Sequence, residues 1–217
     1  MKWPTLEELA IQVPLPSGYR FAPVEADSLA TLIAALKSWY PEISVGSNCC
    51  YLREDFYRDR VCLDGSTDRD ICATKILYGN ELVGFWTFER EVDALALYGR
   101  LIVVAPAHRE ARLTAHALAG AENVARTMGA AFIYAFATLK IRYAQQALER
   151  AGYRLLGFFP GREREEVAPG VVKRVYQAVY AKLLVSPDAV HWPEVRNMTP
   201  RTRELFELLF PEQCAAG

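Results

Sequence analysis

The chain has 217 residues, of which 52% are apolar and 24% charged, and its formal net charge is −1. A sequence of this length and composition can bury a substantial core, which excludes disordered, collagen-like and low-complexity proteins. It contains no apolar run approaching the roughly 18 residues that span a bilayer, and its start, Met1-Lys2-Trp3-Pro4, lacks a signal-peptide segment. We therefore expect a cytoplasmic protein without a membrane partner.

Charge is distributed unevenly along the chain. Residues 1–99 contain 9 Lys and Arg against 15 Asp and Glu, residues 100–164 contain 10 against 4, and residues 165–217 contain 6 against 7. A basic middle segment between acidic flanks favours an anionic ligand held by that segment over a nucleic-acid partner, which usually needs a basic surface throughout. Solvated arginines on helix faces would give the same excess.

The cysteines indicate free thiols. The sequence contains Cys49, Cys50, Cys62, Cys72 and Cys214, an odd set without a CxxC pair. This spacing fits reduced thiols better than a disulfide framework or a zinc site. No recognisable motif brings a His or Asp beside Cys49-Cys50, so we expect neither a metal site nor a covalent cysteine nucleophile.

Hydrophobic periodicity predicts the order of elements. The predicted strands cover residues 19–23, 72–78, 81–88, 95–104, 131–136, 153–159 and 171–184. The predicted helices cover residues 29–40, a short stretch near 52–61, 110–128, 141–150 and a tail helix with Leu205, Leu208 and Phe210 as its apolar face. These elements predict a single domain over residues 19–185, between extensions over 1–18 and 186–217.

Two turns are predicted from their residues. Gly79-Asn80 tolerates the positive φ of a two-residue turn, so the strands on either side form an antiparallel hairpin. Pro160-Gly161 is expected to turn the chain after the strand over 153–159, and a charged loop then leads to the return strand. Antiparallel strands combined with βαβ crossovers give an α/β, mixed-sheet (α+β) class rather than a doubly wound sheet.

One strand-to-helix turn carries the functional signal. The buried strand that ends at Val104 runs through Ala105-Pro106 into the predicted helix at Glu110. The first amides of a helix have no partner within it, so this turn is a natural anion site, and Arg109 and Arg112 add positive charge.

This segment resembles the GNAT superfamily, the acyl-CoA-dependent N-acyltransferases. The family pattern is a strand that ends in Val-x-Pro, then an aromatic residue or His, then Gln/Arg-x-x-Gly-x-Gly/Ala at a helix start. Here Val104, Pro106, His108 and Arg109 fall on those positions. The resemblance extends over the element order of residues 19–185, about three quarters of the chain, and includes Ala144 and the Ala151-Gly152-Tyr153 ending.

The resemblance implies a fold, a donor and a reaction. The fold is a central, mostly antiparallel sheet with a splayed parallel pair and helices on both faces, in a family that often dimerises. The donor is acetyl-CoA or another acyl-CoA, whose acyl group is attacked directly by the amine of a small molecule, without a metal. A main-chain N–H, that of Val104, would polarise the thioester carbonyl. The implied cofactor-binding residues are Ile102, Val103 and Val104 for the pantetheine, and Arg109, Glu110, Ala111, Arg112, Leu113 and Thr114 for the diphosphate.

The diphosphate motif is degenerate. Arg112 stands at the family's glycine, Thr114 at its second small residue, and Ile141 at an asparagine near the start of the last core helix. Leu148 stands at the tyrosine that protonates the departing thiolate. General acid help is worth about 100- to 10,000-fold.

Other side chains are therefore candidates for proton transfer. Tyr143 and Tyr98 are the candidate acids, although a structural role is favoured for each, because buried tyrosines are common in cores. Glu89, with Glu91 beside it, is the candidate base, and a solvated strand end is the alternative reading of both glutamates. The acceptor is expected against residues 39–70 and the predicted hairpin over 72–88, where acids and aromatics suit a cationic amine. Surface ion pairs between these acids and nearby arginines are the alternative interpretation.

Three functions remain open from the sequence. The first is transfer of an acetyl group from acetyl-CoA. The second is transfer of a longer acyl group from CoA or an acyl carrier protein, as in N-acyl amino acid or acyl-homoserine lactone synthases, with Arg109, Arg112 and Arg142 meeting the acidic carrier. The third is a GNAT-like binding module without turnover.

Overall fold

The computed structural model describes residues 1–211, and Cys214 lies outside the described residues. The chain divides into two compact units, Met1–Leu184 and Val185–Gly217. No helix within residues 1–211 has the length and apolar character needed to cross a membrane. Within the same residues, no three His, Cys, Asp or Glu side chains come together as a metal-binding group.

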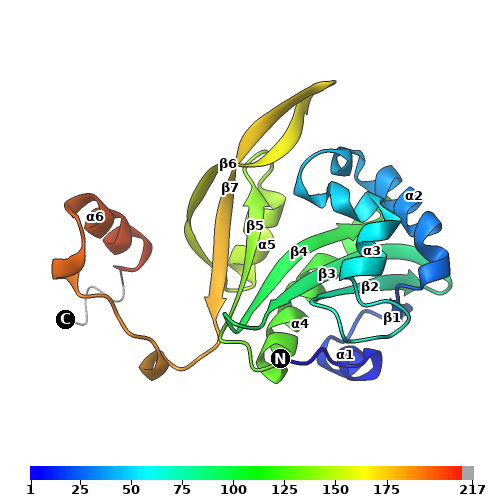
Figure 1. Ribbon diagram of the computed structural model, residues 1–217, viewed down its shortest axis with the longest axis horizontal. Helices are drawn as coiled ribbons and strands as arrows, with labels where there is room; N and C mark the ends of the chain where they lie inside the picture. Colours follow the sequence, from blue (N-terminus) through cyan, green and yellow to red (C-terminus); the bar gives the residue numbers. More distant parts are fainter. Residues whose placement is uncertain (212–217) are drawn as a thin grey trace. The chain divides into compact units, whose positions relative to one another are not determined.

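The first unit is built on one seven-stranded sheet (Figure 1). The strands are β1 (Tyr19–Pro23), β2 (Ile71–Tyr78), β3 (Glu81–Glu91), β4 (Ala96–Val104), β5 (Phe132–Thr138), β6 (Arg154–Ala168) and β7 (Val171–Leu183). Their order is β1-β2-β3-β4-β5-β7-β6. β4 and β5 are parallel, and each other neighbouring pair is antiparallel.

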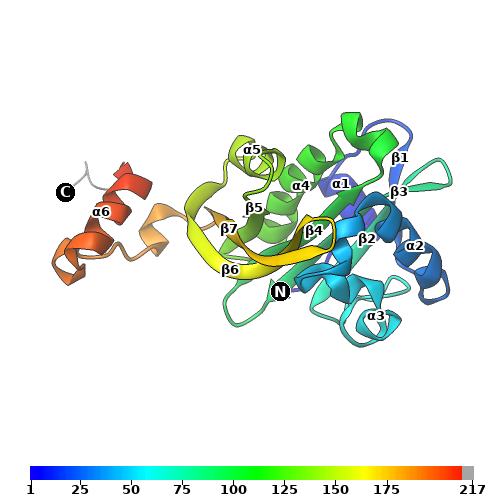
Figure 2. The same ribbon diagram turned by 90° about the horizontal axis from the view of Figure 1, so that it is seen from above.

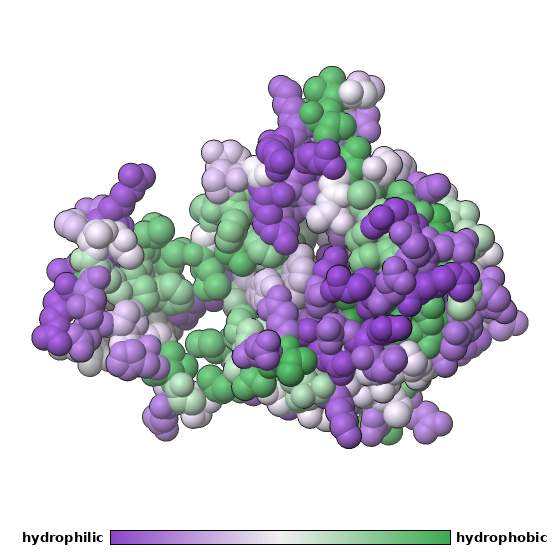
Figure 3. Space-filling view, in the orientation of Figure 1, coloured by the Kyte–Doolittle hydropathy of each residue, from purple (hydrophilic) through white to green (hydrophobic). Residues whose placement is uncertain are grey.

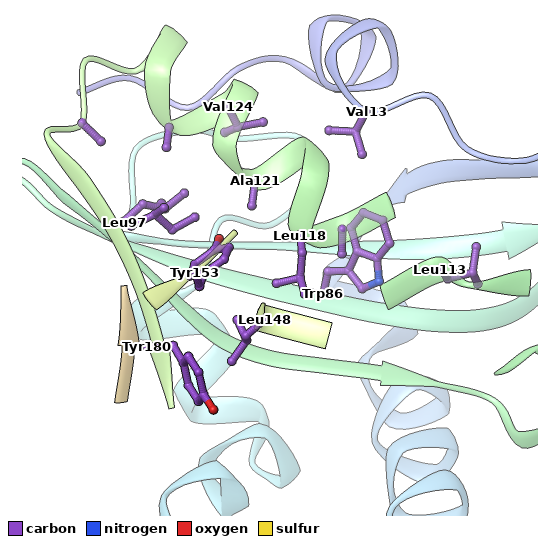
Figure 4. Packing of buried hydrophobic residues seen from close by; sticks show 14 of the residues in the cluster. Val13, Trp86, Leu97, Leu113, Leu118, Ala121, Val124, Leu148, Tyr153 and Tyr180 are labelled. Carbon is purple, nitrogen blue, oxygen red and sulfur yellow. The ribbon is translucent and has the colours of Figure 1, made fainter. Parts of the chain in front are cut away.

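Helices cover both faces of the sheet (Figure 2). The helices of this unit are α1 (Leu6–Gln12), α2 (Leu29–Trp39), α3 (Glu54–Arg60), α4 (Leu113–Thr127) and α5 (Tyr143–Arg150). On one face, α4 packs Leu118, Ala121 and Val124 in a cluster with Trp86 and Leu97 of the sheet (Figure 4). On the other, α2 and α3 pack in a second cluster with the opposite side chains of β3 and β4. The predicted mixed α/β class is confirmed.

Residues before β1 contribute to the first of these clusters. Trp3 and Val13, on either side of α1, are buried in it. Trp3 also donates a hydrogen bond of 2.9 Å from its indole nitrogen to the main-chain oxygen of Arg69. A Cβ at Gly120 would collide with Val13, so glycine is what lets the chain after α1 approach α4. The segment expected as an extension therefore covers part of the core.

The β6–β7 hairpin is longer than the sequence predicts. β6 continues through Pro160-Gly161 to Ala168, and the chain turns at residues 169–170, so the expected turn and charged loop are wrong. Pro160 is tolerated because β6 is the edge strand and residues 160–162 have no partner in the register with β7, so its missing N–H removes no ladder bond. The pairing register with β7 shifts between Phe159 and Glu163, and Gly161 has φ +68°. Pro160-Gly161 thus forms an irregularity within a strand.

The helix expected over 110–128 begins later. Pro106–Ala111 is a 3₁₀ helix, Arg112 has the left-handed conformation with φ +55°, and α4 starts at Leu113. A left-handed residue between two helical turns changes the chain direction. The turn after β4 is therefore a separate segment between strand and helix.

The second unit contains the predicted tail helix. α6 runs over Pro200–Leu209, and the Thr199 side chain caps it by accepting a 3.3 Å hydrogen bond from the Thr202 N–H. Leu205 and Leu208 are exposed. Phe210 follows the helix, and its ring packs 5.0 Å from that of Phe206.

An ion pair between α4 and β7 gives a stability prediction. Lys182 donates a 2.5 Å hydrogen bond to Glu122 and lowers the pKa of that carboxyl below its usual value of 4.5. The stabilisation is therefore complete above that value and is lost as the pH falls through the lowered pKa. Glu122→Gln should lower the free energy of unfolding by about 1 kcal/mol at neutral pH, and the difference from wild type should shrink in acid.

Urea unfolding of the two proteins at neutral and acidic pH measures this difference. Asp59→Asn is the matched control, because Asp59 is exposed on α3 and makes no ion pair within the described residues. A loss for Glu122→Gln that is equal at both pH values, or equal to that of the control, would contradict the assignment.

Candidate functional site

The parallel strands β4 and β5 pair only at their beginnings. Their register runs from Ala96 opposite Phe132 to Gly99 opposite Ala135, while β4 continues to Val104 and β5 to Thr138. Figure 1 shows the two strands diverging beyond this point. The second half of β4 therefore has no strand on the β5 side.

A β-bulge marks the point of separation. Phe88 of β3 pairs with Gly99 and Thr87 pairs with Leu101, so Arg100 is the extra residue of β4. A bulge bends its strand and increases the local twist, which turns the end of β4 away from β5. The parting of the sheet follows from this one inserted residue.

The Arg100 side chain is fixed in the bulge by two hydrogen-bonding partners. Its guanidinium bonds to the Glu89 carboxylate, and its Nε donates a 3.0 Å hydrogen bond to the Tyr51 hydroxyl. Tyr51 in turn shares a 2.8 Å hydrogen bond with Thr87, the neighbour of Arg100 on β3. Tyr51 is fully buried, so this network connects the bulge to the second core cluster.

Two amides of β4 face the gap. The N–H of Ala105 donates to the oxygen of Val83 at 2.8 Å, and Gly84 lies opposite Val104. Hydrogen-bonded and non-bonded pairs alternate along an antiparallel ladder, so Val104 and Ile102 belong to non-bonded pairs. Their N–H and C=O groups therefore point away from β3, to the side that β5 has left.

The gap is a cleft of about 700 Å³. Its walls include residues 99–104 of β4, residues 134–136 and Thr138 of β5, and Ala144, Ala147 and Leu148 of α5. The end of α2 and the β6–β7 hairpin contribute Tyr40, Glu42, Glu163 and Glu165. One part of the cleft is thus apolar with exposed main chain, and the other carries carboxylates.

The hairpin beside the cleft has a hydrophilic stem and an apolar tip. Figure 3 shows hydrophilic side chains along it and apolar ones at its end. Val167, Val171 and Val172 flank the turn and are 42–43% exposed.

Helix α4 begins beside the cleft with free donors. Arg112 is its N-cap residue, and no side chain caps the first turn. Arg112 is exposed and does not line the cleft, whereas Thr114 lines it. Arg109 also lines the cleft, and its guanidinium donates to the main-chain oxygens of Val104 at 3.4 Å and of Trp39 at 3.2 Å. Uncapped amides with a nearby guanidinium suit an anionic group.

The carboxylates are buried around a phenol. Glu163 and Glu165 are 7% and 9% exposed. Burial, followed by the charges of Glu165, Glu42 and Glu163, raises the pKa of Tyr40 to about 12. Tyr40 therefore remains a neutral hydrogen-bond donor at neutral pH.

The predicted cofactor-binding residues separate into two groups. Ile102, Val103, Val104, Arg109 and Thr114 line the cleft. Glu110, Ala111, Arg112 and Leu113 do not line it: Leu113 is buried in the core, while Glu110 and Arg112 are exposed.

The predicted proton-transfer residues lie in different surroundings. Tyr143 lies in the first turn of α5 and lines the cleft. Leu148, further along the same helix, is buried and also lines the cleft. Tyr98 stacks on Tyr134, with ring centroids 4.9 Å apart, and does not line the cleft. Glu89, also outside the lining, bonds to Arg100 and lies 3.6 Å from a nitrogen of Arg60.

Glu163 and Glu165 were not among the predicted site residues. The segment Arg162-Glu163-Arg164-Glu165 reads as a charged loop by composition. Its strict alternation of sign, however, is a period of two, which is typical of a strand with different faces. That alternation was the available signal, because it separates buried glutamates from exposed arginines.

Comparison with solved structures identifies the architecture. Mutant forms of SpeG, a spermidine/spermine N-acetyltransferase from Vibrio cholerae, superpose with a TM-score of 0.61 at 13% identity, over 78% of this chain and 95% of their own. RimL, a ribosomal L7/L12 α-N-protein acetyltransferase in complex with coenzyme A, gives 0.60 at 13% identity, over 79% and 97%. The chain has the GNAT fold.

A third GNAT-fold neighbour is a putative phosphinothricin N-acetyltransferase, with a TM-score of 0.58 at 16% identity over 77% of this chain and 99% of its own. The sequence itself matches no protein-family model and no curated protein. The predicted GNAT architecture with its splayed parallel pair is thus confirmed at the level of fold.

The network at the bulge gives a second stability prediction. Arg100→Met should lower the free energy of unfolding by about 2–3 kcal/mol, because Glu89 loses a partner in a half-buried site and Tyr51 loses a donor. Arg60→Met is the control, since Arg60 meets the same carboxylate from a side chain that is 57% exposed, and should cost under about 0.5 kcal/mol. Similar losses in urea unfolding for both variants would refute the role of Arg100.

Proposed function

We propose that this protein is an N-acyltransferase that moves an acyl group from acyl-CoA to the amine of a small molecule. The observation that carries the proposal is the parting of β4 and β5, which leaves the N–H groups of Ile102 and Val104 without a neighbouring strand along a cleft of about 700 Å³. Extended ligands that contain amides bind such strand edges by adding to the ladder. Pantetheine, which has two amides in line, fits this description.

The diphosphate is assigned to the start of α4. Uncapped amides and the helix dipole attract anions there, and Arg109 adds a positive charge at the rim. Arg112 stands where the GNAT pattern has glycine. Because it takes the positive φ that glycine favours and its side chain is exposed, main-chain access is preserved.

The reaction follows from these positions. The amine nitrogen attacks the thioester carbon, the C–N bond forms, the C–S bond breaks, and the amine loses a proton while CoA leaves as a thiolate. The N–H of Val104 faces the gap and is proposed to polarise the carbonyl. Tyr143, which lines the cleft, is the proposed donor of a proton to the thiolate, since Leu148 cannot supply one. Glu89 is assigned to the bulge, where arginines bind it, rather than to proton transfer.

GNAT-fold neighbours support a CoA donor and an amine acceptor. RimL is described with coenzyme A, and SpeG is a spermidine/spermine acetyltransferase. Acetyl is the proposed acyl group. Leu148, which lines the cleft, cannot donate a proton, so we expect slower turnover than in an enzyme with an acid at this position. A protein that binds the donor without turnover is the extreme outcome of this loss.

Calorimetry with acetyl-CoA tests the donor site. Arg109→Glu should raise the dissociation constant at least about fivefold, because it brings a negative charge to the diphosphate. Lys37→Glu, an exposed charge reversal on α2 away from the cleft lining, should leave it unchanged. An equal constant for wild type and Arg109→Glu, or no binding at millimolar acetyl-CoA, would rule out the assignment.

Turnover is read from the release of free CoA thiol in the presence of a primary amine, with acetyl-CoA and a longer acyl-CoA run in parallel. Val104→Pro removes the N–H that faces the cleft without removing a bond to β3, so it should abolish release in a folded protein. Release that persists in Val104→Pro would contradict the mechanism. Donor binding without release in wild type would leave a binding module.

A further inference from the structure

One carboxylate in the cleft is buried without a positive partner. Glu163 is 7% exposed, lines the cleft, and makes no ion pair with any residue among 1–211. The neighbouring carboxylate differs, because Glu165 lies 3.6 Å from the Lys140 ammonium nitrogen. Glu163 is therefore the buried negative charge in the cleft that the chain does not balance.

The fold fixes this carboxylate in position. Its Oε1 accepts hydrogen bonds from the N–H of Ser47 at 2.7 Å and from the N–H of Arg164 at 2.9 Å. Its Oε2 accepts from the Ser47 hydroxyl. Four lone-pair directions serve a carboxylate, so three donors leave it with capacity to accept another bond.

A glycine makes this arrangement possible. Gly46 has a backbone φ of +83°, which residues with a side chain rarely adopt. A Cβ at this position would also collide with the Glu163 carboxylate and lie 2.6 Å from the Arg164 main-chain oxygen. The loop after α2 thus approaches the hairpin closely, so that its amide meets Glu163. Two segments separated by 116 residues in sequence meet at this side chain.

The cost of burying the Glu163 carboxylate indicates that a cation is missing beside it. An ionised carboxylate taken out of water costs several kcal/mol unless a cation or enough hydrogen bonds compensate it. Half-buried glutamates elsewhere receive such cations: Lys182 on Glu122 and Arg100 on Glu89. At Glu163 the donors are neutral, and the open side faces the cleft. A positively charged ligand group would complete it.

Surrounding groups suit an amine. The Tyr40 hydroxyl lies in the field of Glu163, Glu165 and Glu42, and Glu42 likewise has no ion pair within the described residues. The ring of Phe136, which also lines the cleft, binds the Arg162 guanidinium on one face at 3.7 Å. Aromatic walls and carboxylates together attract organic cations.

We propose that Glu163 binds a protonated nitrogen of the acceptor, and that the acceptor is a small aliphatic amine with a positive charge besides its reacting nitrogen. The inference rests on the proposed function and deepens it. Glu163 is a specificity-determining residue, so its loss weakens acceptor binding and raises KM, with a smaller effect on kcat. The donor site is unaffected.

The test compares a diamine with a monoamine of the same length. Binding of 1,4-diaminobutane and of n-butylamine is measured by calorimetry in the presence of CoA, for wild type and for Glu163→Gln. The glutamine oxygen can still accept from the N–H groups of Ser47 and Arg164, and its NH2 group can donate to the Ser47 hydroxyl oxygen, so the fold is preserved while the charge is removed. Wild type should bind the diamine more tightly, and Glu163→Gln should weaken it at least tenfold while changing the monoamine little.

Glu166→Gln is the matched control. Glu166 lies on β6, does not line the cleft, and accepts from the Gly170 N–H at 2.6 Å, which glutamine can also do. It should leave diamine binding within about twofold of wild type. Steady-state assays with acetyl-CoA should show the raised KM for Glu163→Gln and not for Glu166→Gln.

The outcomes separate the two claims. The role of Glu163 is overturned if Glu163→Gln leaves diamine binding unchanged, or if wild type binds both amines with equal affinity. This holds even where the protein binds CoA and acetyl-CoA is turned over. Diamine binding lost in Glu163→Gln, in a protein that binds no CoA, supports the cation site and refutes the acyltransferase proposal.

Discussion

The structure depends on one inserted residue. Arg100 is the extra residue of β4 opposite β3, and a parallel pair that would otherwise continue stops at Gly99 and Ala135. Unpaired strand edges are costly in a core and are usually covered. Here the edge borders a cleft of about 700 Å³, and the bulge is fixed by Glu89, Tyr51 and Thr87. A buried hydrogen-bond network thus keeps the sheet open, and the hydrogen bonds that β4 does not make with β5 are left for a ligand to form.

Other energetically unfavourable features also lie close to the cleft. Arg112 takes a left-handed conformation, which is energetically unfavourable for residues other than glycine. This conformation ends the turn beyond β4 before α4 begins. Glu163 is buried without a cation, and Gly46 has positive φ to let Ser47 reach it. These features lie around the cleft. Strain and buried charge concentrated at one place are typical of a binding site, because selection for stability alone would remove them.

Much of this could be predicted from the sequence, and the exceptions have physical reasons. Apolar periodicity predicted the strands and helices, and Val104, Pro106 and Arg109 indicated the GNAT fold. The bulge was not predicted, although Gly99-Arg100 inside an apolar strand was an available signal, because a glycine within a strand often marks a bulge. Pro160-Gly161 was misread as a turn because both residues favour turns, whereas an edge strand tolerates them. Glu163 was missed because its burial depends on Ser47, which lies 116 residues away in sequence.

Residue-resolved hydrogen exchange tests directly whether the N–H groups of Ile102 and Val104 lack a strand partner. In the free protein, Ile102 and Val104 should exchange faster than Leu101 and Val103, which belong to bonded pairs with β3. Saturating acetyl-CoA should slow exchange at Ile102 and Val104 at least about tenfold and leave Leu101 and Val103 nearly unchanged. Equal protection of all four amides without donor, or no added protection with it, would contradict the account.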